Sequence, residues 1–253
     1  MRSRNDSVTV STETGSYTGR EVIVTVSVGV LKSGIIAFDP PLPKWKTAAL
    51  DTIRMATYVK VFAVWPDKWW TEADFETYGG MAWVVLLDSG EAGDQWRIFT
   101  PMPTDAAMLQ FSAIDKEGKR IERLSDSQLK AEIAAKLGKA FPYKTIPEPS
   151  FVKMTDWSSN ELYQGAYSFQ EVVPEGVDVD DIRWPIKNDR PGGGIWFAGE
   201  AMSSRYGGYM HAAYHSGTEV ATQIREAYGI AFAIGIKYSK LLAAAAIIAN
   251  LIA

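Results

Sequence analysis

The chain has 253 residues, 47% of them hydrophobic and 22% charged, which is enough for one large hydrophobic core or two smaller ones. Its net charge of -4 argues against nucleic acid as a partner, because binding to phosphates requires a basic surface. The absence of cysteine excludes disulfide bonds and thiolate chemistry.

The N-terminal part of the sequence predicts β-structure. Residues 1–16 contain no apolar stretch of the kind that a cleavable secretory signal needs, so the cytoplasm is the default location. β-branched residues around Gly15 and Gly19 predict a hairpin or meander that continues to Val26. Residues 45–54 then predict a helix, and the alternation in residues 55–65 predicts a strand.

The middle of the chain predicts an antiparallel sheet backed by one helix. Short apolar runs at residues 82–87, 95–99 and 108–113 predict further strands of the same sheet. Residues 125–141 predict a helix, since Ser125 and Gln128 form a capping box and apolar residues recur every four positions after it.

The most informative segment is residues 195–217. An apolar strand leads into Gly199-Glu200, a loop of small residues follows, and a helix is predicted from about Gly208 to Ala227. Glycines let the main chain approach a ligand, an acid can bind a hydroxyl, and a helix start offers free N–H groups. This combination is typical of a site for a large polar cofactor.

The last segment, residues 230–253, is apolar but interrupted by Lys237, Ser239 and Lys240. Neither flank reaches the roughly 20 apolar residues that a membrane span needs. Three alternatives stay open for it: a short amphipathic or docking helix, a membrane anchor, or a tail without function.

Four separated segments give the sequence a family resemblance. They resemble, in order and spacing, the flavin-containing amine oxidases and among these the plant-type polyamine oxidases. The segments are residues 24–43, residues 55–70, Trp157 with residues 163–168, and residues 197–217. The resemblance implies FAD as the cofactor, a small-molecule amine as the substrate and oxygen as the second substrate.

The resemblance also implies roles for four residues outside the glycine-rich loop. Lys60 would hold a water beside the flavin N5, Tyr167 and Tyr209 would form the two aromatic walls around the substrate amine, and Trp157 would pack near the flavin ring. Without the resemblance, Lys60 is a lysine on a solvated strand face, and the three aromatic residues belong to ordinary cores.

Three more residues would hold the cofactor. Gly199 is the glycine of the signature, Glu200 would bind a FAD hydroxyl, and the Met210 N–H would face the flavin C2 carbonyl at the start of the helix. The helical pair His211 and His215 lacks a third ligand, so no metal site is expected.

Two features bear on partners. The acidic residues between Glu171 and Asp181 either steer a polyamine to the site or form a solvated loop, and the solvated loop is favoured. The GxGxxG fingerprint that holds the nucleotide end of FAD in this family does not occur in the sequence. We therefore expect a truncated fragment, one part of an oxidase whose N-terminal FAD-binding half is on another chain, or a degenerate binding domain.

The expected fold class is α+β, with an incomplete FAD-binding domain and an inserted substrate domain made of an antiparallel sheet and a helix. Strands of the FAD-binding domain are expected in residues 1–33, the substrate domain in 34–150, the return to the FAD-binding domain in 151–229, and the tail in 230–253. The activity that the resemblance implies is oxidation of an amine, by the similarity to plant-type enzymes a polyamine, to an imine or aldehyde with release of hydrogen peroxide. The alternatives are a monoamine, amino acid or methylated-lysine oxidase, for which Arg205 is the nearby cation, and a non-catalytic binding fragment.

Overall fold

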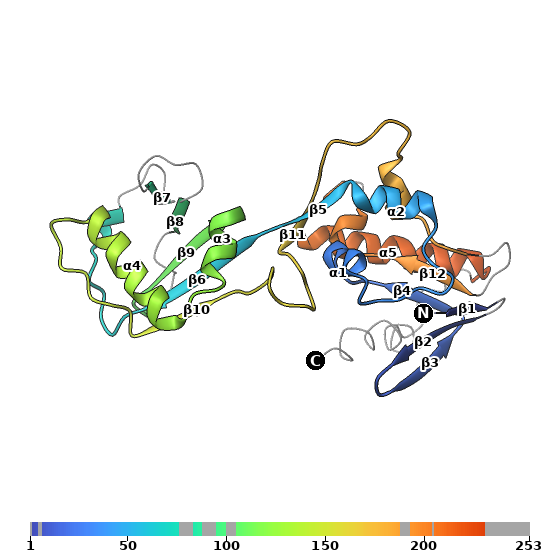
Figure 1. Ribbon diagram of the computed structural model, residues 1–253, viewed down its shortest axis with the longest axis horizontal. Coiled ribbons are helices and arrows are strands. Elements are labelled where there is room, and N and C mark those ends of the chain that lie inside the picture. Colours follow the sequence, from blue (N-terminus) through green and yellow to red (C-terminus); the bar gives the residue numbers. More distant parts are fainter. Residues whose placement is uncertain are drawn as a thin grey trace. The chain divides into compact units, whose positions relative to one another are not determined.

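The computed structural model describes residues 2–4, 7–75, 83–87, 95–99, 105–187, 193–203 and 205–230. The chain divides into two compact units (Figure 1). The terminal unit comprises residues 1–55 and 162–253, and the middle unit comprises residues 56–161. The chain thus leaves the terminal unit once and returns to it, with boundaries that differ from the expected ones near residues 33 and 150.

The middle unit is a five-stranded antiparallel sheet with helices packed against it. Its strands, in sheet order, are β10 (Phe151–Met154), β6 (Tyr58–Val64), β9 (Met108–Ile114), β8 (Gln95–Phe99) and β7 (Trp83–Leu87). Its helices are the 3-10 helix η1 (Glu72–Phe75), α3 (Asp115–Ile121) and α4 (Asp126–Ala140). The predicted antiparallel pairing is confirmed.

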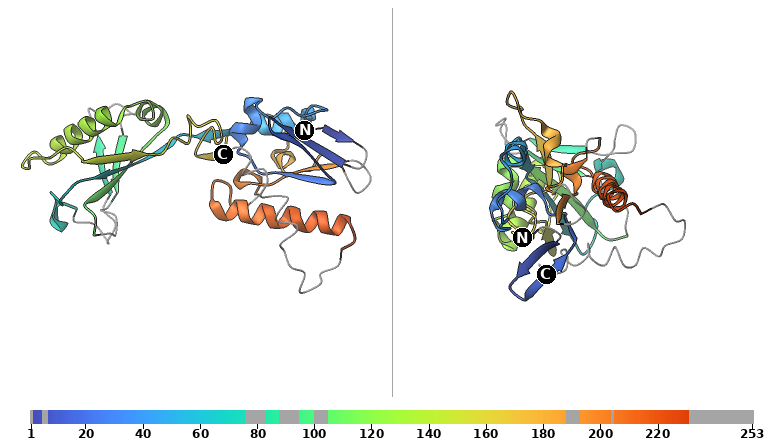
Figure 2. Two further views of the ribbon diagram at one scale, coloured as in Figure 1. Left: turned by 90° about the horizontal axis from the view of Figure 1, so that it is seen from below. Right: turned by 90° about the vertical axis from the view of Figure 1, so that its right-hand side faces the viewer.

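Alternation along the strands builds the core of this unit. Val59, Val61 and Ala63 of β6 are buried, whereas Lys60 between them is exposed. The buried residues pack with the inner face of β9 and with Leu129, Ile133 and Leu137 of α4, which covers one face of the sheet (Figure 2). The capping box at Ser125 is present as predicted, and it fixes where α4 begins.

The terminal unit contains three small sheets. β1 (Arg2–Arg4), β2 (Ser7–Thr12) and β3 (Gly15–Gly19) form an antiparallel sheet, which includes the predicted hairpin. β4 (Glu21–Val24) pairs in parallel with β12 (Gly194–Phe197), and β5 (Ile53–Ala56) pairs with β11 (Tyr167–Gln170). The helical elements are α1 (Val28–Ser33), α2 (Lys44–Asp51), η2 (Val179–Ile182), η3 (Glu200–Met202) and α5 (Met210–Ala227).

The β4–β12 pair lies between two layers of helix. All four residues of β12 are buried. Phe197 packs in a core with residues of α1 and α2, whereas Trp196 packs with Val220 of α5. Figure 2 shows α5 on the face of this pair opposite to α1 and α2. This arrangement explains why the segment reads as continuously apolar in the sequence.

Three local predictions differ from the structure. Residues 28–33 form the helix α1 rather than strand, because the Ser27 side chain accepts a hydrogen bond from the Val30 N–H and begins a helix there. The predicted strand at residues 55–65 is two strands interrupted at Thr57, and the predicted helix at residues 45–54 ends at Asp51. β5 belongs to the terminal unit and β6 to the middle unit, so the break coincides with the crossing between units.

Two further observations concern membranes and the C-terminal segment. No helix in the part of the chain that the structure describes is both long and apolar enough to cross a bilayer. Residues 231–253, which hold nearly all of the predicted tail, lie outside the described residues.

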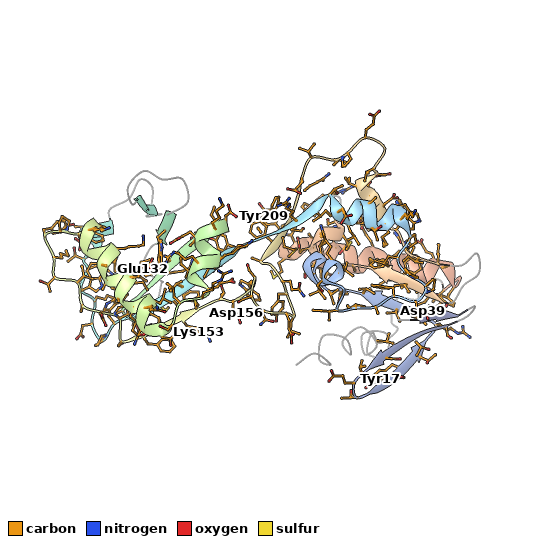
Figure 3. All side chains as sticks on the ribbon, in the orientation of Figure 1. Tyr17, Asp39, Glu132, Lys153, Asp156 and Tyr209 are labelled. Carbon is orange, nitrogen blue, oxygen red and sulfur yellow. The ribbon has the colours of Figure 1, made fainter. Side chains whose placement is uncertain are left out.

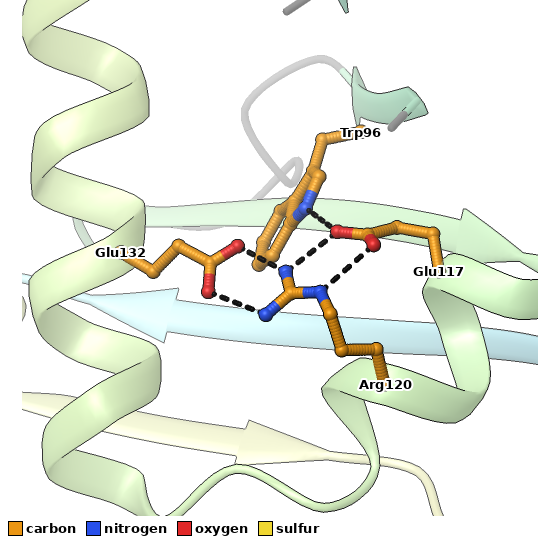
Figure 4. A network of polar contacts seen from close by, with 4 residues as sticks. All are labelled: Trp96, Glu117, Arg120 and Glu132. Atoms are coloured by element: carbon orange, nitrogen blue, oxygen red, sulfur yellow. Dashed lines mark hydrogen bonds and ion pairs between the residues drawn. The ribbon is translucent and has the colours of Figure 1, made fainter. Parts of the chain in front are cut away.

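A polar network ties the helices of the middle unit to its sheet (Figure 4). The Glu117 carboxylate accepts hydrogen bonds from the Trp96 Nε1–H at 2.9 Å and from the Arg120 Nε–H at 2.8 Å. Arg120 also donates to Glu132 of α4, with Nη1 at 3.0 Å from Oε2. The Glu117 side chain is 8% exposed and the Arg120 side chain 44%, so the acid is the buried member of the network.

Ionised Glu117 should stabilise the fold. Burial alone would raise the pKa of Glu117, but hydrogen bonds from Arg120 and Trp96 and the charges of Arg120 and Lys136 outweigh burial and hold that pKa below its ordinary value. Because the folded pKa is the lower one, this stabilisation is fully present above the ordinary glutamate pKa of about 4.3 and is lost as the pH falls through the folded value.

We predict that Glu117→Gln lowers the free energy of unfolding at pH 7 by about 1.5–3 kcal/mol, nearer the lower figure because Arg120 is partly solvated. The variant should also lose part of the wild-type dependence of stability on pH below about 4.3, measured by urea unfolding at several pH values. Glu132→Gln is the matched control, since Glu132 bonds the same Arg120 from a more exposed position. Equal losses in the two variants would contradict the assignment of Glu117 as the buried anchor.

Candidate active site

The carboxyl ends of β4 and β12 lie side by side. Val24 pairs with Phe197, and the Ala198 N–H donates to the Val24 carbonyl at 3.0 Å. Directly after this pair comes Gly199, with φ 152° and ψ 179°, a conformation that side-chain-bearing residues rarely adopt. Ligands of open parallel sheets bind outside the carboxyl ends of the strands. The predicted signature segment therefore stands where a ligand is expected.

Ser216 of α5 fastens Gly199 to the last long helix. Its side chain is buried, its Oγ accepts from the Gly199 N–H at 3.0 Å, and it lies 2.8 Å from the Gly199 carbonyl oxygen. Both polar groups of this glycine are thus engaged by one hydroxyl. The contact fixes the start of η3 against α5.

The Glu200 carboxylate joins two other segments. Its Oε1 accepts from the Ser168 N–H at 2.9 Å, and its Oε2 accepts from the Ser168 Oγ–H and the Gly208 N–H, both at 2.8 Å. Ser168 lies on β11, and Gly208 lies in the loop before α5. The acid is half-buried and hydrogen-bonded, as the sequence favoured, and its described partners are protein groups.

A cavity of about 660 Å³ opens beside these contacts, within the range of small-molecule sites. Tyr167 and Tyr209 both line it, and both are exposed, by 39% and 64%. Exposed rings on a cavity wall are available to a ligand, so these two tyrosines are not core residues. The lining residues are Ile53, Tyr167, Ser168, Phe169, Gln170, Val179, Asp180, Ile182, Arg183, Ala201, Ser203, Gly207, Gly208 and Tyr209.

The start of α5 is open to a ligand. Tyr209 is the N-cap residue and makes no side-chain cap, and the first turn of this 18-residue helix holds no acid. Met210, the first helical residue, is 90% exposed. The first turn of α5 thus carries no acid of its own at the positive end of the helix dipole, and the Glu200 carboxylate contacts the loop just before it, at the Gly208 N–H.

The two histidines of α5 form aromatic contacts. The His211 ring stacks on Tyr209 with centroids 5.3 Å apart and meets the Tyr206 ring at 4.7 Å. His215 lies near Tyr206 and 3.8 Å from a Glu219 carboxylate oxygen. Among the described residues, no three acid, histidine or cysteine side chains gather as metal ligands would.

Lys60 and Trp157 lie in the middle unit, where one threonine links their segments. The Lys60 N–H donates to Thr155 Oγ1 at 3.0 Å, and the Thr155 N–H donates to the Lys60 carbonyl at 2.9 Å. Within this unit Lys60 is exposed and Trp157 is 37% exposed. The structure therefore joins the segments of these two predicted site residues in the middle unit, and it groups the other five in the terminal unit.

The cavity wall includes Asp180 of the acidic segment and a cation, Arg183, that the sequence did not indicate. Asp180 and Arg183 of the η2 segment both line it, and they form an ion pair at 2.8 Å. Arg205, the cation considered for an amino-acid substrate, is not among the lining residues. The i, i+3 spacing of Asp180 and Arg183 was the available signal.

The sequence also missed Lys46, a fully buried lysine that supports this wall. Its Nζ donates to the carbonyl oxygens of Asp181, Ile182 and Trp184 at 3.0, 2.9 and 2.7 Å. The same atom lies 4.0 Å from the centroid of the Phe197 ring. Burial lowers the pKa of Lys46 to about 7, and the charge of Asp181 acts in the opposite direction.

A signal for this burial does exist in the sequence. Lys46 shares the helical face of Ala49 and Leu50, at i, i+3 and i+4, and both of these residues are buried. A lysine on an apolar stripe is normally read as a long side chain that reaches the surface. Here the Lys46 ammonium group does not reach water, and the carbonyl oxygens at and just after the end of η2 accept its hydrogen bonds instead.

Comparison with known proteins identifies the family. A family model described as flavin containing amine oxidoreductase matches residues 1–225. The chain belongs to this family.

The curated relatives of this chain within the family include plant polyamine oxidases. Polyamine oxidase 1 of Zea mays is 37% identical over 217 residues, which cover 85% of this chain and 41% of that protein. Polyamine oxidase 7 of Oryza sativa subsp. japonica is 36% identical, over 83% of this chain and 42% of that protein. The chain thus spans about two-fifths of the length of these curated relatives.

A solved structure confirms the fold at this level. Cyclohexylamine oxidase from Brevibacterium oxydans IH-35A superposes with a TM-score of 0.66 and 25% identity, covering 89% of this chain and 47% of that one. The amine oxidase type of FAD-binding fold is therefore shared, with mixed helix and sheet as predicted. The segments that contain Lys60 and Glu200 both lie within residues 1–225, which match the family model.

Family membership implies FAD, and the residues present fit a flavin. Gly199 has no side chain to fill the space at the carboxyl ends of the parallel strands, and the first turn of α5 offers N–H groups and carries no acid. A carboxylate has about four acceptor positions, of which the described donors use three at Glu200, so one remains for a cofactor hydroxyl. These are the donor and acceptor types that a flavin and its ribityl chain require.

Lys46→Met should destabilise the terminal unit by roughly 3 kcal/mol, because methionine fills the volume but removes the donor from one buried and two partly buried carbonyls. Lys44→Met, on the exposed face of the same helix, should change stability by less than about 0.5 kcal/mol. Thermal unfolding of the two variants measures the difference. Similar stabilities would show that the carbonyl contacts of Lys46 add nothing.

Proposed function

We propose that this chain forms the flavin-ring side of an FAD-dependent amine oxidase that acts on polyamines. The observation that carries the proposal is the cavity in which Tyr167 and Tyr209 stand exposed beside the open start of α5. The similarity to polyamine oxidases over most of the chain supports a polyamine rather than another amine. When bound, FAD would accept a hydride from the carbon beside the substrate nitrogen and pass the electrons to oxygen, which yields hydrogen peroxide.

The chain's own residues bind and orient. The faces of Tyr167 and Tyr209 attract a cationic amine and restrict an extended aliphatic chain to one orientation. The first-turn N–H groups at Met210 would stabilise negative charge on the flavin ring. Lys60 would hold a water for proton transfer, and Trp157 would pack near the ring system.

The charge on the cavity wall favours a polyamine over an amino acid. An amino acid oxidase needs a cation to bind the substrate carboxylate, and the Arg183 guanidinium is already neutralised by Asp180 at 2.8 Å. Because this ion pair carries no net charge, the faces of Tyr167 and Tyr209 would be the groups of this wall that recognise the substrate. The released products would be an aldehyde, formed by hydrolysis of the imine, and the remaining amine.

We further propose that activity needs the nucleotide end of FAD to be held by a polypeptide with a GxGxxG fingerprint, since the sequence printed here has none. That polypeptide would be the N-terminal FAD-binding half of the same oxidase. The shared cofactor would then connect the two parts.

The decisive experiment loads the full chain with FAD, alone and together with the N-terminal half of a plant polyamine oxidase, and follows flavin absorbance. We expect spermidine to bleach the flavin under anaerobic conditions and to produce peroxide in air, with a slower response to a monoamine and none to an amino acid. A protein that stays colourless in both settings, or a flavin that spermidine does not reduce, would overturn the proposal.

Lys60→Met should slow turnover of the flavin about a hundredfold, because it removes the group proposed to hold the proton-transfer water. Lys153→Met is the matched control. Lys153, labelled in Figure 3, is exposed on β10. It pairs with Phe62, two residues after Lys60, and therefore lies on the same face of the sheet as Lys60. Stopped-flow traces of flavin reduction and reoxidation measure both variants. Equal rates in the Lys60 and Lys153 variants would exclude the proposed role of Lys60.

A further inference from the structure

One carboxylate contacts the neighbours of both cavity tyrosines. Glu200 accepts hydrogen bonds from the N–H of Ser168, the residue after Tyr167, and from the N–H of Gly208, the residue before Tyr209. The tyrosines are 42 positions apart in the numbering, and they come from a strand and from the residue that caps a helix. Their backbones are nevertheless linked through a single side chain.

The two backbones meet closely at this link. Gly208 has φ +84°, which favours glycine, and a Cβ added there would lie 3.5 Å from the Ser168 carbonyl oxygen and 3.8 Å from Cδ2 of Tyr167. The loop before α5 is thus in van der Waals range of the Tyr167 ring. A change in the position of Gly208 therefore changes the space beside Tyr167 directly.

Glu200 is itself held in place. It begins η3 directly after Gly199, whose N–H and carbonyl are both bound by the buried Ser216 of α5. The carboxylate is therefore a fixed acceptor rather than a mobile surface group. A fixed acceptor with two fixed donors has the geometry of a spacer between the segments it joins.

We infer that Glu200 is a positioning residue that sets the gap between the Tyr167 and Tyr209 rings by holding the backbones of both. The inference rests on the proposed function for its purpose, since the gap matters only where an amine lies between the rings. The contacts by which Glu200 holds the two backbones can be tested without any catalysis. Glu200 thereby determines how thick a substrate chain the two walls admit.

Amide hydrogen exchange in the full chain tests the link without any activity. Glu200→Ala should accelerate exchange at Ser168 and Gly208 by about tenfold or more, because both amides lose a charged acceptor. Glu200→Gln retains one oxygen acceptor, so only one of the two amides should stay protected. The amides of Ile195 and Ala198, which donate within the β12 region, should keep their protection and report that the variants are folded.

Ser168→Ala is the matched control. It removes the 2.8 Å bond from the hydroxyl and leaves both backbone bonds to Glu200, so the Gly208 amide should exchange as in the wild type. A Glu200→Ala chain whose Ser168 and Gly208 amides stay protected overturns the inference. So does a Ser168→Ala chain that loses Gly208 protection as fully as Glu200→Ala does.

A second measurement reports on the rings. In protein labelled with fluorotyrosine, the fluorine resonances of Tyr167 and Tyr209 should shift together in Glu200→Ala and Glu200→Gln, but not in Ser168→Ala. The resonance of Tyr228, whose hydroxyl donates to Glu21 at 2.8 Å in the same unit, should stay in place in all variants. Unmoved Tyr167 and Tyr209 resonances would show that the carboxylate does not set the gap, whether or not the chain oxidises amines.

Discussion

The parallel pairing of β4 with β12 is the constraint on which the rest of the terminal unit depends. It brings Val24 beside Phe197, residues that are 173 positions apart in the numbering, and it aligns the carboxyl ends of both strands. Gly199 and Glu200 leave this edge together with Thr25 to Ser27, from which α1 begins. Helices then cover both faces, so the pair is buried in the manner of parallel sheets.

From that edge, a chain of polar contacts fixes the cavity. Ser216 attaches Gly199 to α5, Glu200 attaches the η3 segment to Ser168 and Gly208, and Lys46 holds the carbonyls that follow η2. Each contact satisfies backbone groups that would otherwise be buried without partners. The polar groups at this site therefore hold the backbone in place, whereas the aromatic rings of Tyr167 and Tyr209 line the cavity.

Local sequence signals predicted the parts of the fold whose causes are local. The capping box at Ser125 and the four-residue spacing after it predicted α4, and alternation predicted the strands of the antiparallel sheet. Residues 28–33 were expected among strands because valines favour strand, while the deciding interactions are the Ser27 cap and the close approach of Gly29 to Gln164. The second of these contacts joins residues far apart in sequence, which no periodicity reports.

The candidate site divides in the same way. The resemblance placed Tyr167, Gly199, Glu200, Tyr209 and Met210 in segments that the structure brings into one unit, and Lys60 with Trp157 in the other. Lys46 and Arg183 were missed because their importance comes from carbonyls and a cavity that only the fold assembles. The spacing of Lys46 on an apolar stripe and of Arg183 three residues after Asp180 is equally compatible with surface charges, so neither signal was decisive.

Several acids between Glu171 and Asp181 are paired within the chain, which limits how this segment could attract a cation. Glu171 pairs with Arg54 at 2.6 Å, Asp180 pairs with Arg183, and the Asp178 side chain accepts from the Asp180 N–H. Acids that are neutralised or engaged by their own chain contribute little long-range field. Under the proposed function, recognition of an ammonium group at this cavity would therefore fall to the short-range attraction of the Tyr167 and Tyr209 faces, which requires the rings to be correctly spaced. Selectivity for extended amines would then depend on the spacing of these two rings more than on the charge of the loop.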